Sequence, residues 1–189
     1  MKKIGILGGT FDPPHLGHLI TAEHIKTELN LGEVWFIPTY EPPHKKSAIA
    51  QGEDRLKMLE LATQDNSSFK VVDWELKQAK KSYTINTIKH FKRKNALNDF
   101  YFIMGADMVE SLSKWKDINE LKQLLTFVGV NRKGYTPQTS IPVILKDMVT
   151  IDISSSFIRN QLSLNKSIKY LVPNEVYSYI KEFNLYETK

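Results

Sequence analysis

Short apolar runs alternate with segments of helical spacing along nearly the whole chain. Runs of about four to eight apolar residues are typical of buried strands, and apolar residues three or four positions apart are typical of helices that cover a sheet. The runs predict strands at Lys3 to Leu7, Val34 to Pro38, Phe69 to Leu76, Phe100 to Met104, Phe127 to Asn131 and Val149 to Ile153. The spacing predicts helices at Leu16 to Leu29, Glu53 to Gln64, Thr84 to Lys94 and Asp117 to Leu125, with two more that begin at the run Ser154 to Ser156 and after Pro173. This alternation predicts an α/β fold, a doubly wound parallel sheet with a helical C-terminal end.

The sequence gives no reason to expect a second functional unit, because it shows no internal repeat, low-complexity tract or charge block. The stretch Lys133 to Pro142 is rich in glycine, proline and threonine, which indicates a surface loop and not a linker between domains. We therefore expect a single domain over residues 1–189. In a doubly wound sheet, ligands lie beyond the carboxyl ends of the strands, so the chemistry is expected in the strand-to-helix turns.

The composition is that of an ordinary packed protein, with 41% hydrophobic and 25% charged residues. The absence of cysteine excludes disulfides, thiolate metal sites and cysteine nucleophiles, and it fits a reducing compartment. At the N-terminus, MKKIGILGGT, glycines interrupt the apolar run too early for a signal peptide, and no later run is long enough to span a membrane. We therefore expect a cytoplasmic protein that is neither exported nor inserted in a membrane.

The net charge is positive, since 26 Lys and Arg against 21 Asp and Glu give 26 − 21 = +5. Lys77, Lys80 and Lys81 form a local basic cluster, so polyanionic ligands are plausible. We interpret the cluster as a solvated surface and not as a nucleic-acid site, because no aromatic-basic RNA motif accompanies it.

The turn after the first predicted strand, GGTFDPPHLGHL, combines three features of a phosphate site. Gly8 and Gly9 let the backbone approach a ligand, the prolines stiffen the entry to the helix, and the helix N-terminus presents free N–H groups. His15 and His18 lie three positions apart at the start of that helix, so both rings can face an anion held over its end. Two surface histidines or a metal-binding pair are the alternatives, although no H-E-x-x-H pattern is present.

Six motifs together carry a resemblance to a known family. The segment GTFDPPHLGH at residues 9–18 resembles the (T/H)xGH signature of the nucleotidyltransferases, here in the form HLGH. The other motifs are PPHKK at 42–46, SYT at 82–84, GAD at 105–107, KW at 114–115 and ISSSFIR at 153–159. In this order they are similar to the bacterial nicotinate mononucleotide adenylyltransferase family, which implies a Rossmann-like fold. Phosphopantetheine adenylyltransferases usually carry threonine where His15 stands, which argues against that family.

The resemblance also implies the residues of the ATP half of the site. It assigns catalytic roles to His15, His18, Lys45 and Arg159, and ATP binding to Gly8, Gly9, Thr10, Phe11, Gly17, Gly105, Asp107, Ser154, Ser155 and Ser156. Lys45 would swing over the triphosphate, and the serine run with Arg159 would hold the β- and γ-phosphates. From the residues alone, Lys45 could equally face solvent beside Lys46, and the serines and Asp107 could be helix caps.

The acceptor half is implied by the same resemblance. Trp115 stands between Lys114 and Lys116, a setting that favours an exposed ring able to stack on a pyridine, with half-buried packing as the alternative. In the family, backbone near SYT and just after KW binds the nicotinate carboxylate, which makes Thr84, Trp115 and Lys116 the expected nicotinate-binding residues. Many relatives carry tyrosine in place of Lys116, but a main-chain N–H can serve with either side chain.

The reaction that the resemblance implies is transfer of AMP from ATP to nicotinate mononucleotide, with Mg²⁺ bound mainly through the ATP phosphates and no protein metal site. The alternatives are nicotinamide mononucleotide or phosphopantetheine as acceptor, aminoacyl-adenylate formation, and a non-catalytic binder of nucleotides or RNA. The lack of a KMSKS-like lysine loop argues against the aminoacyl-adenylate alternative. The tail Tyr170 to Tyr186 has an apolar face of Val176, Tyr179 and Ile180 that could complete the core or form a homodimer interface.

Overall fold

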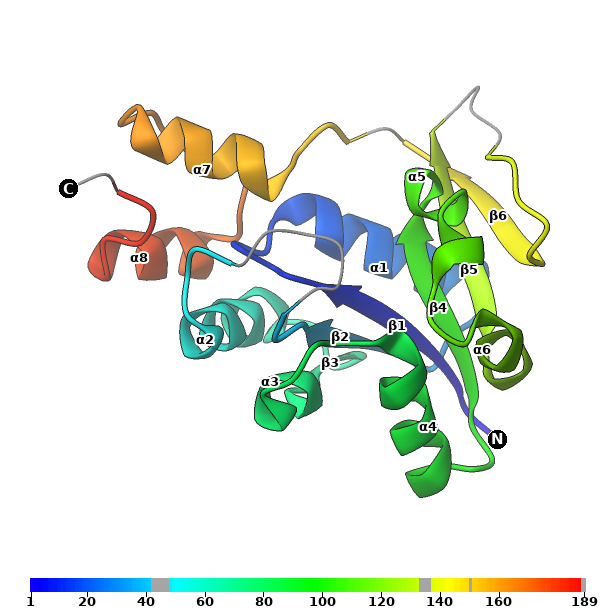
Figure 1. Cartoon of the computed structure of the whole chain (residues 1–189). Helices are drawn as coiled ribbons and strands as arrows, with labels where there is room; N and C mark the ends of the chain where they lie inside the picture. Colours follow the sequence, from blue (N-terminus) through cyan, green and yellow to red (C-terminus); the bar gives the residue numbers. More distant parts are fainter. Residues whose placement is uncertain (42–47, 133–136, 150, 188–189) are drawn as a thin grey trace.

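The computed structural model describes residues 1–41, 48–132, 137–149 and 151–187. Within them, one sheet is formed by the strands β1 (Lys3–Gly9), β2 (Glu33–Pro38), β3 (Phe69–Val71), β4 (Asp99–Gly105), β5 (Thr126–Arg132) and β6 (Val143–Met148). All five strand pairs are parallel, in the order β3-β2-β1-β4-β5-β6 (Figure 1). The order reverses between β1 and β4, as the alternating pattern of a doubly wound sheet requires.

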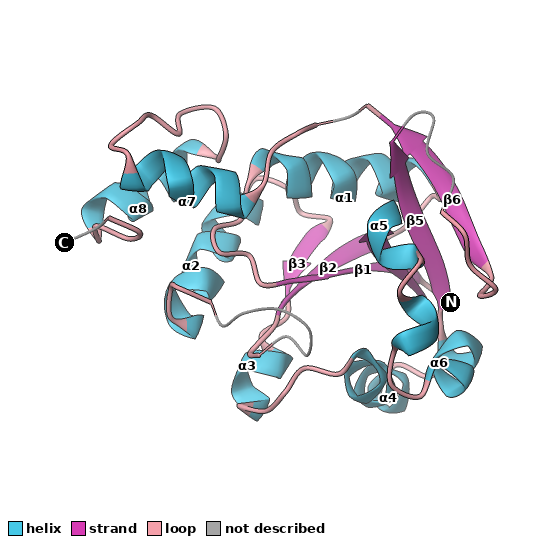
Figure 2. Cartoon of the chain, turned by 45° about the horizontal axis from the view of Figure 1, so that its top comes forward, coloured by secondary structure: helices cyan, strands magenta, loops and turns pink. Residues whose placement is uncertain are grey.

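Helices cover both faces of this sheet. They are α1 (Leu16–Glu28), α2 (Gly52–Thr63), α3 (Trp74–Gln78), α4 (Thr84–Lys94), α5 (Ala106–Val109), α6 (Ile118–Leu124), α7 (Ser155–Ser163) and α8 (Asn174–Glu182), with a 3-10 turn η1 (Leu112–Lys114). Figure 2 shows α1 on one side of the sheet and α4 with α6 on the other. The predicted α/β, Rossmann-like sheet with a helical C-terminal end is therefore confirmed.

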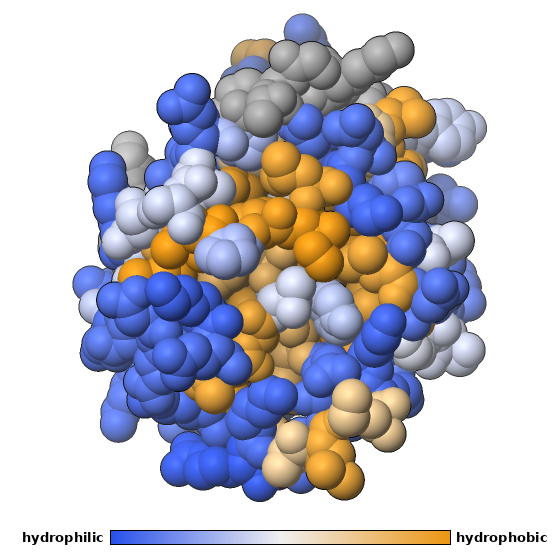
Figure 3. Space-filling view, turned by 90° about the vertical axis from the view of Figure 1, so that its right-hand side faces the viewer, coloured by the Kyte–Doolittle hydropathy of each residue, from blue (hydrophilic) through white to orange (hydrophobic). Residues whose placement is uncertain are grey.

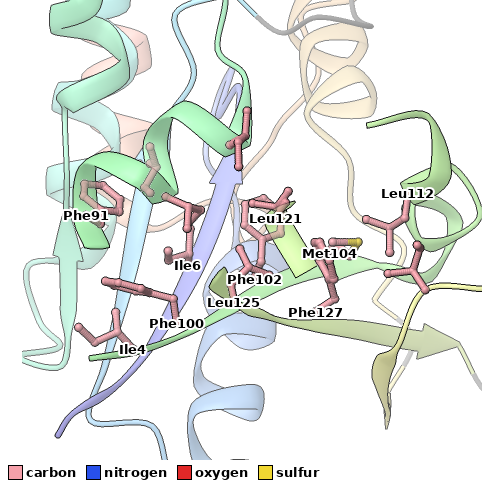
Figure 4. Close-up of a cluster of buried hydrophobic side chains, with 14 of the residues drawn as sticks. Ile4, Ile6, Phe91, Phe100, Phe102, Met104, Leu112, Leu121, Leu125 and Phe127 are labelled. Carbon is pink, nitrogen blue, oxygen red and sulfur yellow. The ribbon is translucent and has the colours of Figure 1, made fainter. Parts of the chain in front are cut away.

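The core follows from the alternation of side chains along the strands. In β4, Phe100 and Phe102 face a cluster with α4 and α6, whereas Ile103 faces a second cluster with α1 and α2. Figure 4 shows the first cluster, in which Ile4 and Ile6 of β1 lie beside the aromatic rings of β4. Both central strands are thus buried on two faces, which is why their sequences read as nearly continuous apolar runs.

A third cluster joins the C-terminal helices to α2. Val176 and Ile180 of α8 are fully buried against Met58 of α2 and Ile158 of α7. Of the two alternatives for the tail, the structure therefore shows core packing for these residues. Tyr179 lies at the edge of the cluster and donates a hydrogen bond to the Asp54 carboxylate at 2.9 Å.

The predicted strand Phe69 to Leu76 is wrong in its second half. Strand β3 ends at Val71, and Trp74 begins α3. The chain turns into a helix after Val71: Asp73 takes the N-cap position of α3, and its carboxylate pairs with Lys77 one turn later, at 2.8 Å.

The predicted strand Val149 to Ile153 is also wrong, because the last strand, β6, lies earlier in the chain. Its parallel register runs from Phe127 opposite Val143 to Arg132 opposite Met148, and Val149 beyond it is 81% exposed. As an edge strand, β6 leaves Ile144 and Leu145 partly exposed, so its apolar pattern is weak. Figure 3, viewed from this side of the molecule, shows hydrophobic residues in a band across the face.

Candidate active site

A cleft of about 1010 Å³ lies at the carboxyl ends of β1, β4 and β5, beside the N-termini of α1 and α7. This is the point where the strand order reverses, the expected place for a ligand. The cleft is lined by every predicted catalytic and ATP-binding residue that the structure describes: Gly8, Gly9, Thr10, Phe11, His15, Gly17, His18, Gly105, Asp107, Ser154, Ser155, Ser156 and Arg159. Lys45 lies outside the described residues. Segments far apart in sequence thus meet around one space large enough for a nucleotide.

The turn after β1 is held in shape by Phe11. Its backbone has a φ of 50°, and its buried ring packs so closely on Gly9 that a Cβ there would lie 3.1 Å from the ring. The same ring meets His18 edge-on, with ring centroids 4.9 Å apart. Phe11 therefore contacts the His18 ring and leaves little room for a side chain at position 9.

The two histidine rings are stacked, with centroids 3.7 Å apart and planes inclined by 26°. The backbone N–H of His15 donates to Nδ1 of His18 at 3.2 Å. Because Nδ1 accepts this hydrogen bond, the proton of a neutral His18 ring is assigned to Nε2. His18 is thereby set up as a hydrogen-bond donor.

His15 occupies the N-cap position of α1 and is only 6% exposed. Burial lowers the pKa of His15 from 6.5 to about 4, so this ring is neutral near pH 7. Gly17 leaves room for this ring, since a Cβ at that position would lie 3.0 Å from His15 Nδ1.

The N-terminus of α7 is tied to the first turn. Ser154 caps the helix by accepting a hydrogen bond from the Phe157 N–H at 3.1 Å, and the Ser155 hydroxyl donates to the Pro13 carbonyl at 2.8 Å. Arg159 donates to the Asp12 carbonyl at 2.6 Å and to Ser156 Oγ at 3.2 Å. Two helix N-termini and a guanidinium therefore face one cleft, an arrangement suited to a polyphosphate.

Asp12 lies beneath this arrangement, and no role was predicted for it. It is 4% exposed and accepts hydrogen bonds from the Ile49 and Ala50 N–H groups at 2.8 and 3.1 Å and from the Tyr186 hydroxyl at 2.8 Å. Its carboxylate also lies 3.7 Å from Arg159 Nη1. The available signal was the position of Asp12 within the first motif; nothing in the local sequence marks Tyr186.

Arg55 is a second buried group that the sequence analysis missed. It is 2% exposed and donates to the Thr10 carbonyl at 2.7 Å and to the Thr39 carbonyl at 2.9 Å. Burial lowers the pKa of Arg55, and the charge of Asp12 opposes that shift. Arg55 thus ties the turns after β1 and β2 together beside Thr10, which lines the cleft.

Gly105 and Asp107 lie at the end of β4. Gly105 is the N-cap residue of α5, and Asp107 stands in the first turn of that helix with its side chain exposed to the cleft. A Cβ at Gly105 would lie 2.6 Å from Asp107 Oδ1, so a side chain at position 105 would displace the carboxylate. The glycine keeps both the strand end and this carboxylate open to a ligand.

Thr84, Trp115 and Lys116 are not among the residues that line the cleft. The expected exposed ring of Trp115 is wrong: it is half-buried, because it packs edge-on against Phe102 and Phe127 at centroid distances of 5.5 and 6.2 Å. Phe102 itself lines the cleft, so Trp115 stands directly behind the cleft wall.

Lys116 lies against the residue that precedes Thr84. The Lys116 ammonium lies 4.7 Å from the centroid of the Tyr83 ring, and Tyr83 immediately precedes Thr84, the first residue of α4. No side chain caps this helix end within the described residues, and its first turn holds no acidic residue. A helix N-terminus beside an ammonium group is suited to a carboxylate.

The described residues contain no group of three or more His, Cys, Asp or Glu that could hold a metal ion. Nor do they contain a helix long and apolar enough to cross a membrane.

The fold and the cleft define a class: an α/β protein of the nucleotidyltransferase type, with phosphate-directed groups at the strand switch point. The model of the cytidylyltransferase-like family matches residues 6–161. Curated relatives match the full chain and carry the name "Probable nicotinate-nucleotide adenylyltransferase". Those from Oceanobacillus iheyensis and Bacillus cytotoxicus are 48% and 47% identical, covering 98% and 100% of this chain and 97% and 100% of their own. The chain belongs to the cytidylyltransferase-like family and, within it, groups with the nicotinate-nucleotide adenylyltransferases.

Solved structures agree on the fold. Plasmodium falciparum nicotinic acid mononucleotide adenylyltransferase complexed with NaAD aligns with a TM-score of 0.80 at 23% identity, covering 98% of both chains. The same protein complexed with APC also gives a TM-score of 0.80, at 21% identity and 98% coverage of both chains. The Rossmann-like arrangement is therefore shared from end to end.

Proposed function

We propose that this enzyme transfers AMP from ATP to nicotinate mononucleotide, giving nicotinate adenine dinucleotide and pyrophosphate for NAD biosynthesis. The observation that carries the proposal is the junction of α1 and α7 in the cleft, where the paired histidines, the serine run and Arg159 converge. The full-length relatives with the nicotinate-nucleotide adenylyltransferase name support the choice of acceptor.

The chemistry needs no covalent enzyme intermediate. A 5′-phosphate oxygen of the acceptor attacks the α-phosphorus of ATP in line; a new P–O bond forms as the bond to the bridging oxygen breaks, and pyrophosphate leaves with that electron pair. The attacking oxygen is already anionic, so the protein contributes positioning and charge stabilisation. His18 donates from Nε2 to the α-phosphoryl oxygens, and neutral His15 lies beside it. Arg159 and the α7 N–H groups stabilise the leaving pyrophosphate.

Mg²⁺ fits this site as an ion that arrives with ATP. The cleft presents hydrogen-bond donors, namely histidine, serine, arginine and helix N–H groups, which match phosphate oxygens. Mg²⁺ prefers phosphate oxygens and water as ligands, so His15, Arg159 and the serine run would hold the ion through the phosphates that they bind. When bound, it would neutralise phosphate charge.

The acceptor is placed at the start of α4 in this proposal. The uncapped N–H groups at Thr84 and the ammonium of Lys116 attract the nicotinate carboxylate, which a nicotinamide ring lacks. Trp115 packs behind Phe102, which lines the ATP cleft. Stacking on the pyridine therefore requires the Trp115 ring to turn outward from Phe102.

A pyrophosphate-release assay tests the function. ATP and Mg²⁺ are offered with nicotinate mononucleotide, nicotinamide mononucleotide or phosphopantetheine, and the adenylylated product is identified by mass. We expect at least tenfold higher kcat/KM with the nicotinate form, because about 1.4 kcal/mol of charge recognition suffices for that factor. Preference for another acceptor would overturn the acceptor assignment and keep the ATP site, whereas ATP binding without turnover would favour the non-catalytic alternative.

Three further expectations remain proposals. Residues 1–189 are proposed to act as one domain, because the third cluster joins the C-terminal helices to α2. We propose that the protein works in the cytoplasm, with small-molecule partners and no nucleic acid, since the cysteine-free sequence fits a reducing compartment. The partly exposed edge strand β6 supports a homodimer, which light scattering would test.

A further inference from the structure

Glu75 is a buried acid that the mechanism above does not use. It is the second residue of α3 and only 7% exposed. Its Oε1 accepts a hydrogen bond from the Thr87 hydroxyl at 2.6 Å, and Thr87 is itself 2% exposed. The bond joins α3 to the first turn of α4.

The position of Thr87 matters because it lies three residues after Thr84. Residues three apart share one face of a helix, so a tether on Thr87 fixes the turn that presents the Thr84 N–H group. Glu75 therefore reaches the proposed nicotinate site through a single intermediate side chain.

A second attachment holds the chain just before α4. The Ser82 N–H donates to the Glu41 carbonyl at 2.9 Å, and the Ser82 hydroxyl accepts from the Tyr40 N–H at 3.1 Å. Tyr40 and Glu41 lie just after the end of strand β2. The segment that enters α4 is thus fixed to the sheet at Ser82 and to α3 at Thr87.

Burying the Glu75 carboxyl group at this position costs free energy. Burial raises its pKa, with the Thr87 and Ser82 hydroxyls acting in the opposite direction. Its other oxygen, Oε2, is buried without a hydrogen-bond partner in the described part of the chain. An apolar side chain of similar size would avoid that cost, so stability alone does not account for an acid at this position.

We propose that Glu75 is a positioning residue for the acceptor: through Thr87 it fixes the N-terminus of α4 beside Lys116, where the nicotinate carboxylate binds. The inference rests on the proposed function and adds to it a residue outside the binding site. Among the described residues, the hydrogen bond of Glu75 goes to Thr87, which does not line the ATP cleft, so the proposed role predicts a change in acceptor binding and not in ATP binding.

The test compares variants that remove the hydrogen bond with variants that keep it. Glu75→Leu and Thr87→Val remove it; Glu75→Gln and Thr87→Ser retain an acceptor and a donor. We expect the first pair to raise KM for nicotinate mononucleotide about tenfold, the usual upper effect of losing one buried hydrogen bond, with KM for ATP changed less than about twofold. The second pair should stay close to the parent. The double variant Glu75→Leu/Thr87→Val should show no further rise, because both changes break one interaction.

Thr63→Val is the matched control. Thr63 is a buried threonine on α2 whose hydroxyl bonds within its own helix at 2.9 Å, so its loss tests stability alone. If Glu75→Leu changed both KM values equally, or changed only the melting temperature as Thr63→Val does, the positioning role would be refuted while the function stood. A parent enzyme that does not adenylylate nicotinate mononucleotide would overturn the proposed function together with the inference.

Discussion

The two histidines of the first turn carry the same side chain but differ in what their surroundings permit. Nδ1 of His18 is engaged by a backbone N–H, which leaves Nε2 as the donor, whereas His15 is buried and neutral. Because His15 is neutral near pH 7, its ring adds no positive charge beside His18. The sequence predicted that both histidine rings face one anion at the start of the helix. It could not predict the tautomer of His18 or the lowered pKa of His15, because both depend on packing that a motif does not show.

Replacing His18 tests its role as a donor. His18→Ala is expected to lower kcat about 10²- to 10³-fold, the usual effect of losing one donor to developing charge, while the Kd for ATP changes little. Steady-state kinetics and calorimetry measure the two quantities. His24→Ala is the control: His24 is on the same helix, its ring contacts the Asp147 carbonyl, and neither residue lines the cleft, so its turnover should match the parent. An unchanged kcat for His18→Ala would remove this residue from the mechanism.

At the scale of single elements, periodicity located the buried strands and long helices but misplaced the edges of the sheet. Helix α4 matches its predicted bounds because four of its residues, Ile85, Thr87, Ile88 and Phe91, are buried with regular spacing. The last strand was predicted too late in the chain, because the edge strand β6 buries too few side chains to leave a strong apolar pattern. The short α3 was hidden because its Glu75 is held by a distant threonine, which local sequence cannot reveal.

Glu33, at the start of β2, joins three neighbouring strands at the end of the sheet opposite the cleft. Its carboxylate contacts the ammonium of Lys2, that of Lys70 at 2.7 Å and the Trp35 indole N–H at 2.8 Å. Burial alone would raise the pKa of Glu33, but these three donors outweigh it and lower the pKa from 4.5 to about 2. A carboxylate with a lowered pKa stabilises the fold above its unfolded pKa, and that contribution is lost as the pH falls from 4.5 towards 2.

The predicted consequence is a pH-dependent difference between the parent and Glu33→Gln. At pH 7 the variant should lose about 1 kcal/mol of unfolding free energy, or roughly 2–4 °C in Tm, because Lys2 and Lys70 are half-exposed and solvent screens their charges. The difference in unfolding free energy between the parent and Glu33→Gln should become smaller as the pH falls below about 4.5, which scanning calorimetry can measure. Glu60→Gln, at an exposed position of α2, is the control with no such gap. A gap that is constant with pH would contradict the charge-based account.

At the scale of the whole molecule, the end of the chain returns to its beginning. The sequence motifs predicted the residues that face the cleft, but not the buried residues beneath them. The hydrogen bond from the Tyr186 hydroxyl to Asp12 spans 174 positions, and no local pattern links the two residues. Burial and the neighbouring Asp12 charge both raise the pKa of Tyr186, so its hydroxyl stays protonated and remains a donor.

Tyr186→Phe tests whether this long-range contact serves the site and not only the fold. The Asp12 carboxylate also lies beside Arg159. Loss of the Tyr186 donor leaves that carboxylate more strongly attracted to Arg159, which is expected to shift the guanidinium that holds the pyrophosphate. We predict about a threefold to tenfold rise in KM for ATP, the effect of one hydrogen bond, with kcat and acceptor KM close to the parent. Tyr179→Phe is the matched control: it removes a similar hydroxyl bond to Asp54 from the same C-terminal region, and should change Tm alone. Equal effects of both variants on Tm, with no change in KM for ATP, would show that the C-terminal segment stabilises the fold without positioning Arg159.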